Sequence, residues 1–317
     1  MSVRKYAIAG LIALTAMSST ASAEYPERPV NLVIPYSAGG GIDLMLRALA
    51  EGLSAKFNQP FVVQNRGGAG GAIGVAHVAN SPADGYTLLF VPALAYSMLP
   101  LTQDVTYSDK SFTPICQTFE NQMALVVRKE SPFKNVRDLV ETARANPSSV
   151  SFGSSPAGNI THLAAVALAD TTNVKFNNIP FKGDGEIMGP LIGGHIDFAA
   201  LTLASAAAAG GNVRIIGIFA DQRNSSLPDI PTVKEQGYDV APTSFGGLFA
   251  PVGVPADMLK TIETGCKFAT EQPGYVKIAA TFHQGNNFYA DSATFKRKLD
   301  ADVVAKKTLL TRLGLAK

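Results

Sequence analysis

The sequence has 317 residues, of which 46% are hydrophobic and 16% charged, and its formal net charge is +2. A nearly neutral chain offers no basic surface for nucleic acid or for an anionic membrane, so no nucleic-acid partner is expected. The composition is that of an ordinary globular protein, and the length favours two domains.

The first 23 residues have the pattern of an export signal. Two basic residues precede the apolar stretch Tyr6–Met17, and "ASA" at Ala21–Ala23 has the small residues of a cleavage site. The apolar stretch is shorter than the roughly 20 residues that a membrane-spanning helix needs. We therefore expect residues 1–23 to be a cleaved signal peptide. The mature protein would begin at Glu24 and be soluble in the periplasm.

Strand-like and helix-like patterns alternate from the start of the mature chain. A first series predicts strands at Val30–Ile34, Phe61–Gln64 and Tyr86–Val91, with helices at Ile42–Ala55 and Ala72–Ala79. Alternation of this kind is typical of βαβ units, so we expect a mainly parallel sheet.

A second series of the same kind begins near Ala124. It predicts strands at Ala124–Arg128, Val150–Gly153, Phe176–Pro180, Ile196–Leu201 and Val213–Phe219, and helices at Val136–Ala145 and Thr161–Asp170. Two long amphipathic helices, Ala256–Thr270 and Thr294–Leu313, end the chain.

Two α/β series followed by C-terminal helices predict two lobes. The chain would cross between them near Phe119–Ala124 and Val240–Ser244. We expect residues 24–122 and 244–317 in lobe 1 and residues 123–243 in lobe 2. Ligands of α/β sheets lie beyond the carboxyl ends of the strands, so two facing lobes would enclose a binding cleft.

The stretch "PYSAGGGID", Pro35–Asp43, joins the first predicted strand to the first helix. Its glycines permit a ligand to approach the backbone closely, and the helix start offers unpaired N–H groups that attract an anion. The alternative is a tight turn that binds nothing. We predict that this turn binds a carboxylate through Ser37, Ala38, Gly39, Gly40 and Gly41.

A second strand-to-helix turn, in "SFGSSPAGNITHLAAVAL" at Ser151–Leu168, repeats this arrangement. Asn and Thr are favourable N-caps, and hydroxyl groups can bind a ligand oxygen. His162 lies in the first helical turn, where the dipole disfavours imidazolium, so we interpret it as a neutral packing residue. Opposed helix ends could together grip a carboxylate without an arginine. The candidate residues of this turn are Ser154, Ser155, Asn159 and Thr161.

Motifs for other functions are missing or incomplete. "NRGGAGGAIG", Asn65–Gly74, contains no G-x-G-x-x-G followed by a suitably placed acid, so we interpret it as a structural turn. "GSSPAG" lacks the G-x-S-x-G form of a serine hydrolase. An exported hydrolase that uses Ser154 and His162 stays open as an alternative, because these residues are close in sequence.

The two cysteines, Cys116 and Cys266, could pair in an oxidising periplasm. The sequence does not establish the required geometry, so a disulfide and two buried thiols both stay open. Neither cysteine belongs to a CxxC motif, and the four histidines are scattered. We therefore expect no metal site, and no motif requires a cofactor.

Six stretches, in order, resemble the Bug family, the periplasmic solute-binding receptors of tripartite tricarboxylate transporters. They are "YPERPVNLVIPYSAGGGID", "VVQNRGGAGGAIGVAHVANSPADGYTLL", "FGSSPAGNITHL", "IPFKGDGEIMGPLIGGHID", "LPDIPTVKEQGYDV" and "FGGLFAPVGVP". Together they span essentially the whole mature chain.

The resemblance implies a type II-like periplasmic-binding-protein fold, a two-lobe Venus flytrap without enzymatic activity. Its ligand would be a small organic carboxylate held by the two turns, with ordered waters as bridges, and its partners would be membrane subunits of the transporter. Asp43 matches the family's acid in the first helical turn, where it would cap the helix and anchor a water. Thr202 would join the ligand residues, and a monomer is expected. A receptor for an amino acid, with Asp43 or Asp184 binding the amine, is a further alternative.

The chain also departs from the family pattern. Pro92–Leu94 stand where small polar residues are common, and Leu201 and Thr202 replace an Asp-Asn pair. Phe181 and Phe245 are expected to add aromatic surface nearby. With fewer polar groups in the cleft, a citrate-like ligand would leave some of its carboxylates unpaired, at a cost of roughly 1–3 kcal/mol per group. We therefore expect a mono- or dicarboxylate with an apolar or aromatic body. Whether the two leucines line the cleft stays open.

Overall fold

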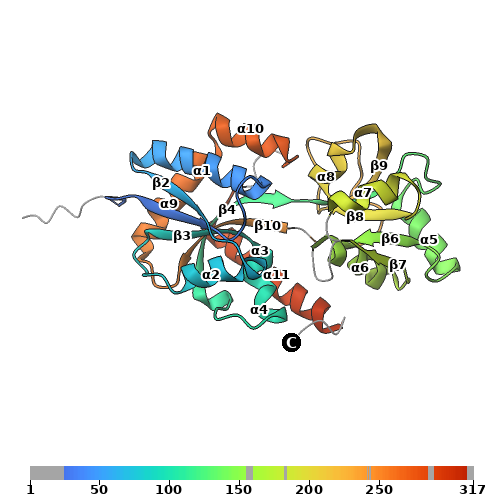
Figure 1. The fold of residues 1–317 in the computed structure, drawn as a ribbon, viewed down its shortest axis with the longest axis horizontal. Helices are drawn as coiled ribbons and strands as arrows, with labels where there is room; N and C mark the ends of the chain where they lie inside the picture. Colours follow the sequence, from blue (N-terminus) through green and yellow to red (C-terminus); the bar gives the residue numbers. More distant parts are fainter. Residues whose placement is uncertain are drawn as a thin grey trace, which may run out of the picture.

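The computed structural model describes residues 25–154, 160–181, 184–240, 242, 244–284 and 289–312, and only the backbone of residues 184 and 185. Figure 1 shows two lobes side by side along the longest axis, each built on its own β-sheet. The predicted signal peptide lies outside the described residues, as do Ser155 and Asn159.

The first lobe is built on a six-stranded sheet of order β11-β4-β10-β3-β1-β2. β1 pairs in parallel with β2 and β3, whereas β10 pairs antiparallel with β3 and β4. The strands are β1 (Val30–Ile34), β2 (Phe61–Asn65), β3 (Thr87–Pro92), β4 (Phe112–Asn121), β10 (Ser244–Pro251) and β11 (Ala290–Asp291).

The second lobe is built on a five-stranded sheet of order β7-β6-β8-β5-β9. β6 pairs in parallel with β7 and β8, and β5 pairs antiparallel with β8 and β9. The strands are β5 (Met123–Arg128), β6 (Ser151–Ser154), β7 (Asn177–Pro180), β8 (Phe198–Thr202) and β9 (Val213–Phe219).

Both sheets are mixed, so the prediction of a mainly parallel sheet is wrong. The antiparallel pairs involve the strands that carry the chain between the lobes. β4 leads through the single residue Gln122 into β5, and the chain returns between Val240 and β10. The strands that enter a lobe from the other one, β10 and β5, run against the strands of the βα units beside them, β3 and β8.

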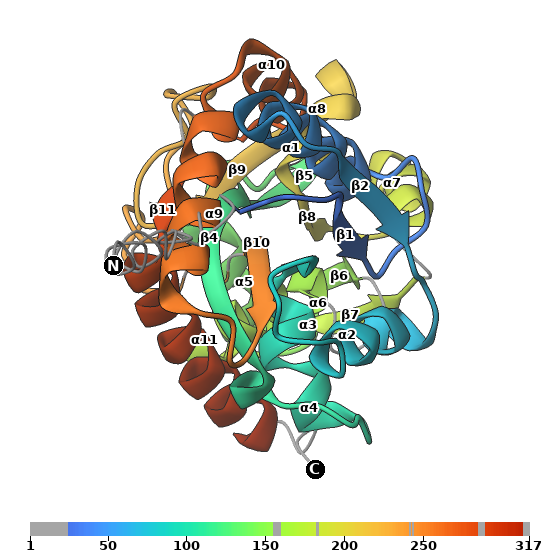
Figure 2. The same cartoon turned by 90° about the vertical axis from the view of Figure 1, so that its left-hand side faces the viewer.

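Helices cover both faces of the first sheet, as Figure 2 shows along the long axis. α1 and α9 pack with one face of the sheet in a core that includes Leu46, Leu49 and Ile262. α2, α3 and α11 pack on the other face. The helices of this lobe are α1 (Gly41–Phe57), α2 (Ala72–Ala79), α3 (Ala93–Ser97), α4 (Leu99–Thr102), α9 (Ala256–Thr270), α10 (Pro273–Thr281) and α11 (Ser292–Arg312).

The second lobe has its own core, formed around Phe152, Phe198 and Leu168. In the described part of the chain, none of the helices in either lobe is long and apolar enough to cross a membrane. The helices of this lobe are α5 (Val136–Ala145), α6 (Ile160–Thr172), α7 (Asp184–Ile192) and α8 (Leu203–Ala208).

A disulfide joins Cys116 of β4 to Cys266 of α9. Of the two states that the sequence left open for these cysteines, the structure has the disulfide and not two free thiols. The two cysteines are 150 residues apart in sequence, and that interval contains the whole second sheet. The bridge therefore connects the two chain segments of the first lobe on either side of the second.

Candidate ligand-binding cleft

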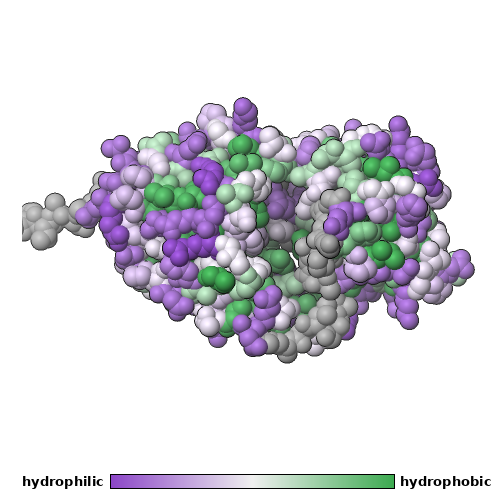
Figure 3. Space-filling model, in the orientation of Figure 1, coloured by the Kyte–Doolittle hydropathy of each residue, from purple (hydrophilic) through white to green (hydrophobic). Residues whose placement is uncertain are grey.

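A hollow separates the two lobes on the face shown in Figure 3. For four strands whose carboxyl ends point toward the other lobe, the next element in the chain is a helix: α1 follows β1, α3 follows β3, α6 follows β6 and α8 follows β8. This is the edge at which α/β sheets bind ligands, because the helix starts present backbone N–H groups there.

The segment Ser37–Gly41, here named the first-lobe turn, is open to solvent. Residues 37–40 are exposed, and Gly40 is the N-cap of α1. Gly39 has φ +89, a conformation that a residue with a Cβ rarely adopts. A Cβ built on Gly40 would meet nothing within 4 Å. Packing within the protein therefore leaves the space beside Gly40 open.

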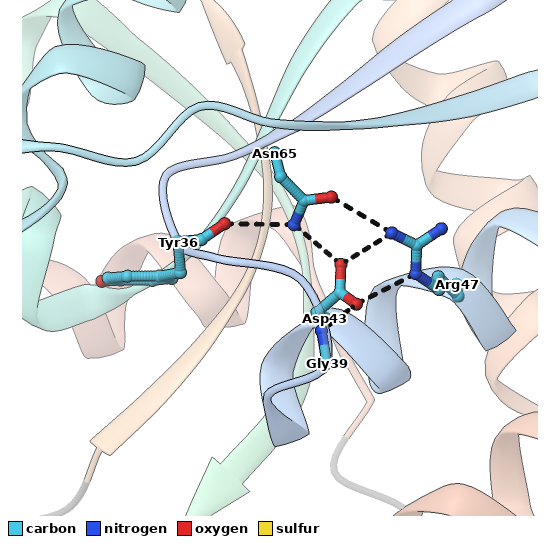
Figure 4. Close-up of polar contacts among 5 residues, drawn as sticks. All are labelled: Tyr36, Gly39, Asp43, Arg47 and Asn65. Atoms are coloured by element: carbon cyan, nitrogen blue, oxygen red, sulfur yellow. Dashed lines mark hydrogen bonds and ion pairs between the residues drawn. The ribbon is translucent and has the colours of Figure 1, made fainter.

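Asp43 holds this turn in place from below, as Figure 4 shows. Its carboxylate accepts hydrogen bonds from the Gly39 N–H (2.9 Å), from Arg47 Nε (2.9 Å) and from Asn65 Nδ2 (2.9 Å). Asn65 also donates to the carbonyl oxygen of Tyr36 (3.0 Å). The network ties the end of β2, the start of α1 and the turn that joins β1 to α1 into one unit.

The Asp43 side chain is only 2% exposed. Burial alone would raise the pKa of this carboxyl. The hydrogen bonds from Arg47, Gly39 and Asn65, with the charge of Arg47, more than offset that effect and lower the pKa. Asp43 is therefore ionised and already paired, and it acts as a positioning residue for the turn.

In the second lobe, Ser154 ends β6 and is completely buried. Its hydroxyl donates to Asn178 Oδ1 at 2.7 Å, which joins β6 to β7. Thr161 and His162 are buried in the first turn of α6, and burial lowers the pKa of His162. The neutral form expected for this histidine agrees with that direction.

Thr202 stands at the end of β8 and caps α8. Its Oγ1 accepts a hydrogen bond from the Ser205 N–H (3.2 Å) and bonds to Ser205 Oγ (2.7 Å). The residue is half-buried, so part of its surface faces solvent at the carboxyl edge of the second sheet. Its main role in the local structure is that of an N-cap.

The apolar replacements contribute less to the cleft than the sequence suggested. Leu201 is fully buried in the core of the second lobe, and Phe245 is 2% exposed and packs against Phe295. Phe245 nevertheless lines a cavity between α6 and α11, described below, so the expectation that it adds aromatic surface stays a prediction. Leu94 is half-buried and packs with Leu163 of the other lobe, so it contributes to a contact between lobes.

A cavity of about 360 Å³ lies elsewhere, between α6 and α11. Leu163 and Ala167 line it from one lobe, and Ala301 and Ala305 from the other. None of the predicted ligand residues lines this cavity, but Phe245, expected from the sequence to add aromatic surface near the ligand, does. Among the described residues, no group of three His, Cys, Asp or Glu side chains could hold a metal ion.

Three residues of the turn network were not predicted. Tyr36 takes part only through its backbone carbonyl group, and since every residue has one, its side-chain type gave no signal. Arg47 lies four residues after Asp43, and this (i, i+4) spacing of opposite charges was a usable signal for their ion pair. Asn65 opens the stretch that we interpreted as a structural turn, and its distance of 22 residues from Asp43 gave no sign of their contact.

The fold and the cleft define a two-lobe periplasmic binding protein. The family model of the tripartite tricarboxylate transporter family receptor matches residues 45–315. The chain belongs to this family of solute-binding proteins, which confirms the resemblance found in the sequence and implies a periplasmic location.

Relatives match over nearly their whole length. A Cupriavidus necator protein, described only as a UPF0065 protein in the gbd 5' region, is 33% identical over 96% of this chain and 94% of its own. A TctC solute-binding protein from Polaromonas, solved without ligand, has a TM-score of 0.82 and 30% identity over 91% of this chain and 99% of its own. An R. palustris protein solved with adipate has a TM-score of 0.74 and 26% identity over 92% of this chain and 99% of its own.

Proposed function

We propose that this protein captures a small organic carboxylate between its lobes and presents it to the membrane subunits of a tripartite tricarboxylate-type transporter. The observation that carries the proposal is the first-lobe turn. Residues 37–40 are exposed at a helix start, and a paired, ionised Asp43 holds the turn from beneath through the Gly39 N–H. Such a site suits a carboxylate, because the helix dipole and free N–H groups favour negative charge.

The ligand class follows from the same surface and from the family. The relative solved with adipate supports an aliphatic dicarboxylate as the first ligand to test. Leu201 is buried in the core of the second lobe. An apolar or aromatic ligand body is therefore supported by Leu94 and Phe181, both half-buried, and by Phe245, which lines the cavity between α6 and α11. We therefore propose a mono- or dicarboxylate, bound by residues 37–41 of one lobe and by the turn before α6, with Thr202, in the other.

Two other functions are less well supported. A hydrolase would need a reactive Ser154, but this side chain is fully buried and its hydroxyl donates to Asn178. An amino-acid receptor that used Asp43 would need an accessible carboxylate, whereas Asp43 is 2% exposed and bonded to Arg47. We propose that the protein is a monomeric receptor without enzymatic activity, exported by residues 1–23.

A thermal-shift screen of residues 24–317 at fixed pH tests the proposal. The acids would be adipate, citrate, an aromatic carboxylate and an amino acid. A ligand at 100 times its dissociation constant adds about 2.7 kcal/mol to the free energy of unfolding, which raises the Tm by several degrees. A response to a carboxylate supports the receptor. No response to any acid would contradict it, and a response only to citrate would contradict the apolar ligand body.

A further inference from the structure

The segment Phe282–Gln284, which follows α10, lies where the two lobes come close. Figure 1 shows α10 of the first lobe extending toward α8 and β9 of the second. The helix ends in a tight turn in which the His283 N–H donates to the Ala280 carbonyl (3.0 Å) and the Gln284 N–H to the Ala279 carbonyl (3.1 Å). His283 has φ +49, a left-handed conformation that is usually adopted by glycine at the end of a helix. A histidine held there indicates that its surroundings determine the backbone.

Phe282 lies against the first-lobe turn. A Cβ built on Gly41 would come within 2.8 Å of Phe282 Cε1, so the phenyl ring packs directly on the first residue of α1. Phe282 also packs in the same core as Tyr36 and Ile42, which flank the turn. The position of this ring therefore limits where the start of α1 can lie.

Gln284 bonds the segment to β4, the strand that leads to the crossing at Gln122, here named the hinge. Its side chain is buried, it accepts a hydrogen bond from the Glu120 N–H (2.7 Å), and it donates to Asn121 Oδ1 (2.5 Å). Glu120 and Asn121 are the last residues of β4 before the crossing at Gln122.

Asn224 reaches the same segment from the second lobe. Its side chain is 2% exposed, and its Nδ2 donates both to Gln122 Oε1 (2.8 Å) and to the His283 carbonyl (2.9 Å). Its Oδ1 accepts from the Ser226 N–H (2.8 Å) within its own loop. One buried amide thus joins a loop of lobe 2, the hinge residue and lobe 1. Because Asn224 is almost inaccessible to solvent, water can hardly replace the bonds of its amide, and breaking them is costly.

We propose that Asn224 is a positioning residue that couples the orientation of lobe 2 to the first-lobe turn through Phe282–Gln284. Movement of lobe 2 about Gln122 displaces Asn224, which pulls on the His283 carbonyl and shifts the Phe282 ring against Gly41. The backbone donors of the turn are then aligned best at one orientation of the lobes. The consequence for ligand binding rests on the proposed function, but the coupling itself is a property of the ligand-free protein.

Asn224→Asp removes the two hydrogen bonds that Asn224 donates across the lobes and keeps the one that it accepts within its own loop. The carboxylate keeps the acceptor for the Ser226 N–H, but it loses both donors and faces two oxygen acceptors, Gln122 Oε1 and the His283 carbonyl. Asn212→Asp is the matched control, because Asn212 is exposed in the same lobe and donates only to the nearby Ala209 carbonyl. Both variants are compared with wild-type residues 24–317, without ligand, by hydrogen exchange and small-angle scattering.

In N224D we expect the amides of residues 36–46 to exchange at least about threefold faster and the radius of gyration to rise, with α2 and α5 unchanged. A general loss of stability would speed exchange everywhere, so equal acceleration in α2 and α5 would overturn the proposal. An unchanged turn, or the same effect in N212D, would also overturn it.

Phe282→Leu tests the coupling from its other end and does not depend on whether N224D folds. We expect faster exchange in residues 36–46 with an unchanged radius of gyration. If exchange in this segment stays at the wild-type rate, the ring does not transmit the position of lobe 2 and the proposal fails. Failure of the proposed receptor function would show separately, as the absence of any thermal shift with adipate or the other acids in the wild-type protein.

Discussion

The Asn65 side chain donates to both Asp43 Oδ1 (2.9 Å) and the Tyr36 carbonyl oxygen (3.0 Å), so one amide ties the end of β2 to the first-lobe turn. Asn65 is itself exposed, whereas Asp43 is buried. The turn is therefore held by a side chain that can be changed without opening the core.

Asn65→Ala removes three hydrogen bonds, the two that Asn65 donates and the one that its Oδ1 accepts from Arg47 Nη2 (3.1 Å). Each contributes about 0.5–1.5 kcal/mol, so we expect the free energy of unfolding to fall by at least about 1.5 kcal/mol. Because the turn is no longer held, the affinity for the carboxylate ligand falls about tenfold. Urea unfolding and calorimetric titration measure the two effects. Gln64→Ala is the control, since Gln64 donates to Asn31 on the neighbouring strand. An equal loss of affinity in both variants would count against a role of Asn65 in the turn.

The pH dependence of stability provides a test of Asp43. Its pKa is lower in the folded protein than the ordinary value of 3.8, since the hydrogen bonds from Arg47, Gly39 and Asn65 outweigh the effect of burial. A carboxyl with a lowered pKa stabilises the fold fully above the unfolded-state value, and this contribution is lost as the pH falls through the folded-state value. We therefore expect the wild-type protein to lose more stability than Asp43→Asn between pH 6 and pH 3. Urea midpoints at several pH values measure this, and parallel curves would contradict it.

Gly40→Asp tests whether the helix start binds the ligand carboxylate. The position has φ −76 and open space for a Cβ, and aspartate is a favourable N-cap, so we expect an unchanged or slightly higher Tm. The new carboxylate repels the ligand carboxylate, and at about 4 Å this costs about 1–4 kcal/mol, a loss of affinity of at least about fivefold. Calorimetric titration with the acid that stabilises the wild-type protein measures it.

The control for this variant is Gly274→Asp. Gly274 lies in the first turn of α10 in the same lobe, and a Cβ there also meets nothing within 4 Å. We expect G274D to bind the ligand like the wild type. If G40D binds equally well, the carboxylate does not lie at the start of α1.

The disulfide is expected to stabilise the whole protein, because it closes a loop with a sequence separation of 150 residues. Cross-links of this kind contribute typically 2–4 kcal/mol, chiefly by restricting the unfolded chain. The double variant Cys116→Ala with Cys266→Ala should therefore have a lower urea midpoint, while its affinity for the ligand stays the same. A midpoint equal to that of the wild type would show that the bridge adds nothing to folding stability.

Several elements followed from the sequence with correct bounds. The predicted strands Val30–Ile34 and Val213–Phe219 are β1 and β9, and the predicted helices Val136–Ala145 and Ala256–Thr270 are α5 and α9. These segments have a clear period of apolar residues, and such a period reflects contacts that each element makes along one face.

Other elements could not be read from local patterns. We did not predict β10, whose sequence "SFGGLFAP" contains two glycines, nor α10 with its proline and glycine start. A Cβ built on Gly247 would lie 1.9 Å from the Cys116 carbonyl oxygen, so this glycine is required by a strand more than 100 residues away. The need for glycine at position 247 therefore arises from the pairing of β4 with β10, and the residues next to it in sequence do not reveal it.

The sequence alone determined the α/β class, the two-lobe receptor family and the turn Ser37–Gly41 as a candidate site, because these depend on local periodicity and on motifs of adjacent residues. Only the tertiary structure decided that Cys116 bonds to Cys266, that Asn65 holds Asp43, that Leu201 and Phe245 are buried in the cores, and that Asn224 meets His283. The physical reason is distance along the chain. Each of these contacts or burials is set by side chains brought together when the sheets, helices and lobes pack, and nothing in the neighbouring residues specifies that partner.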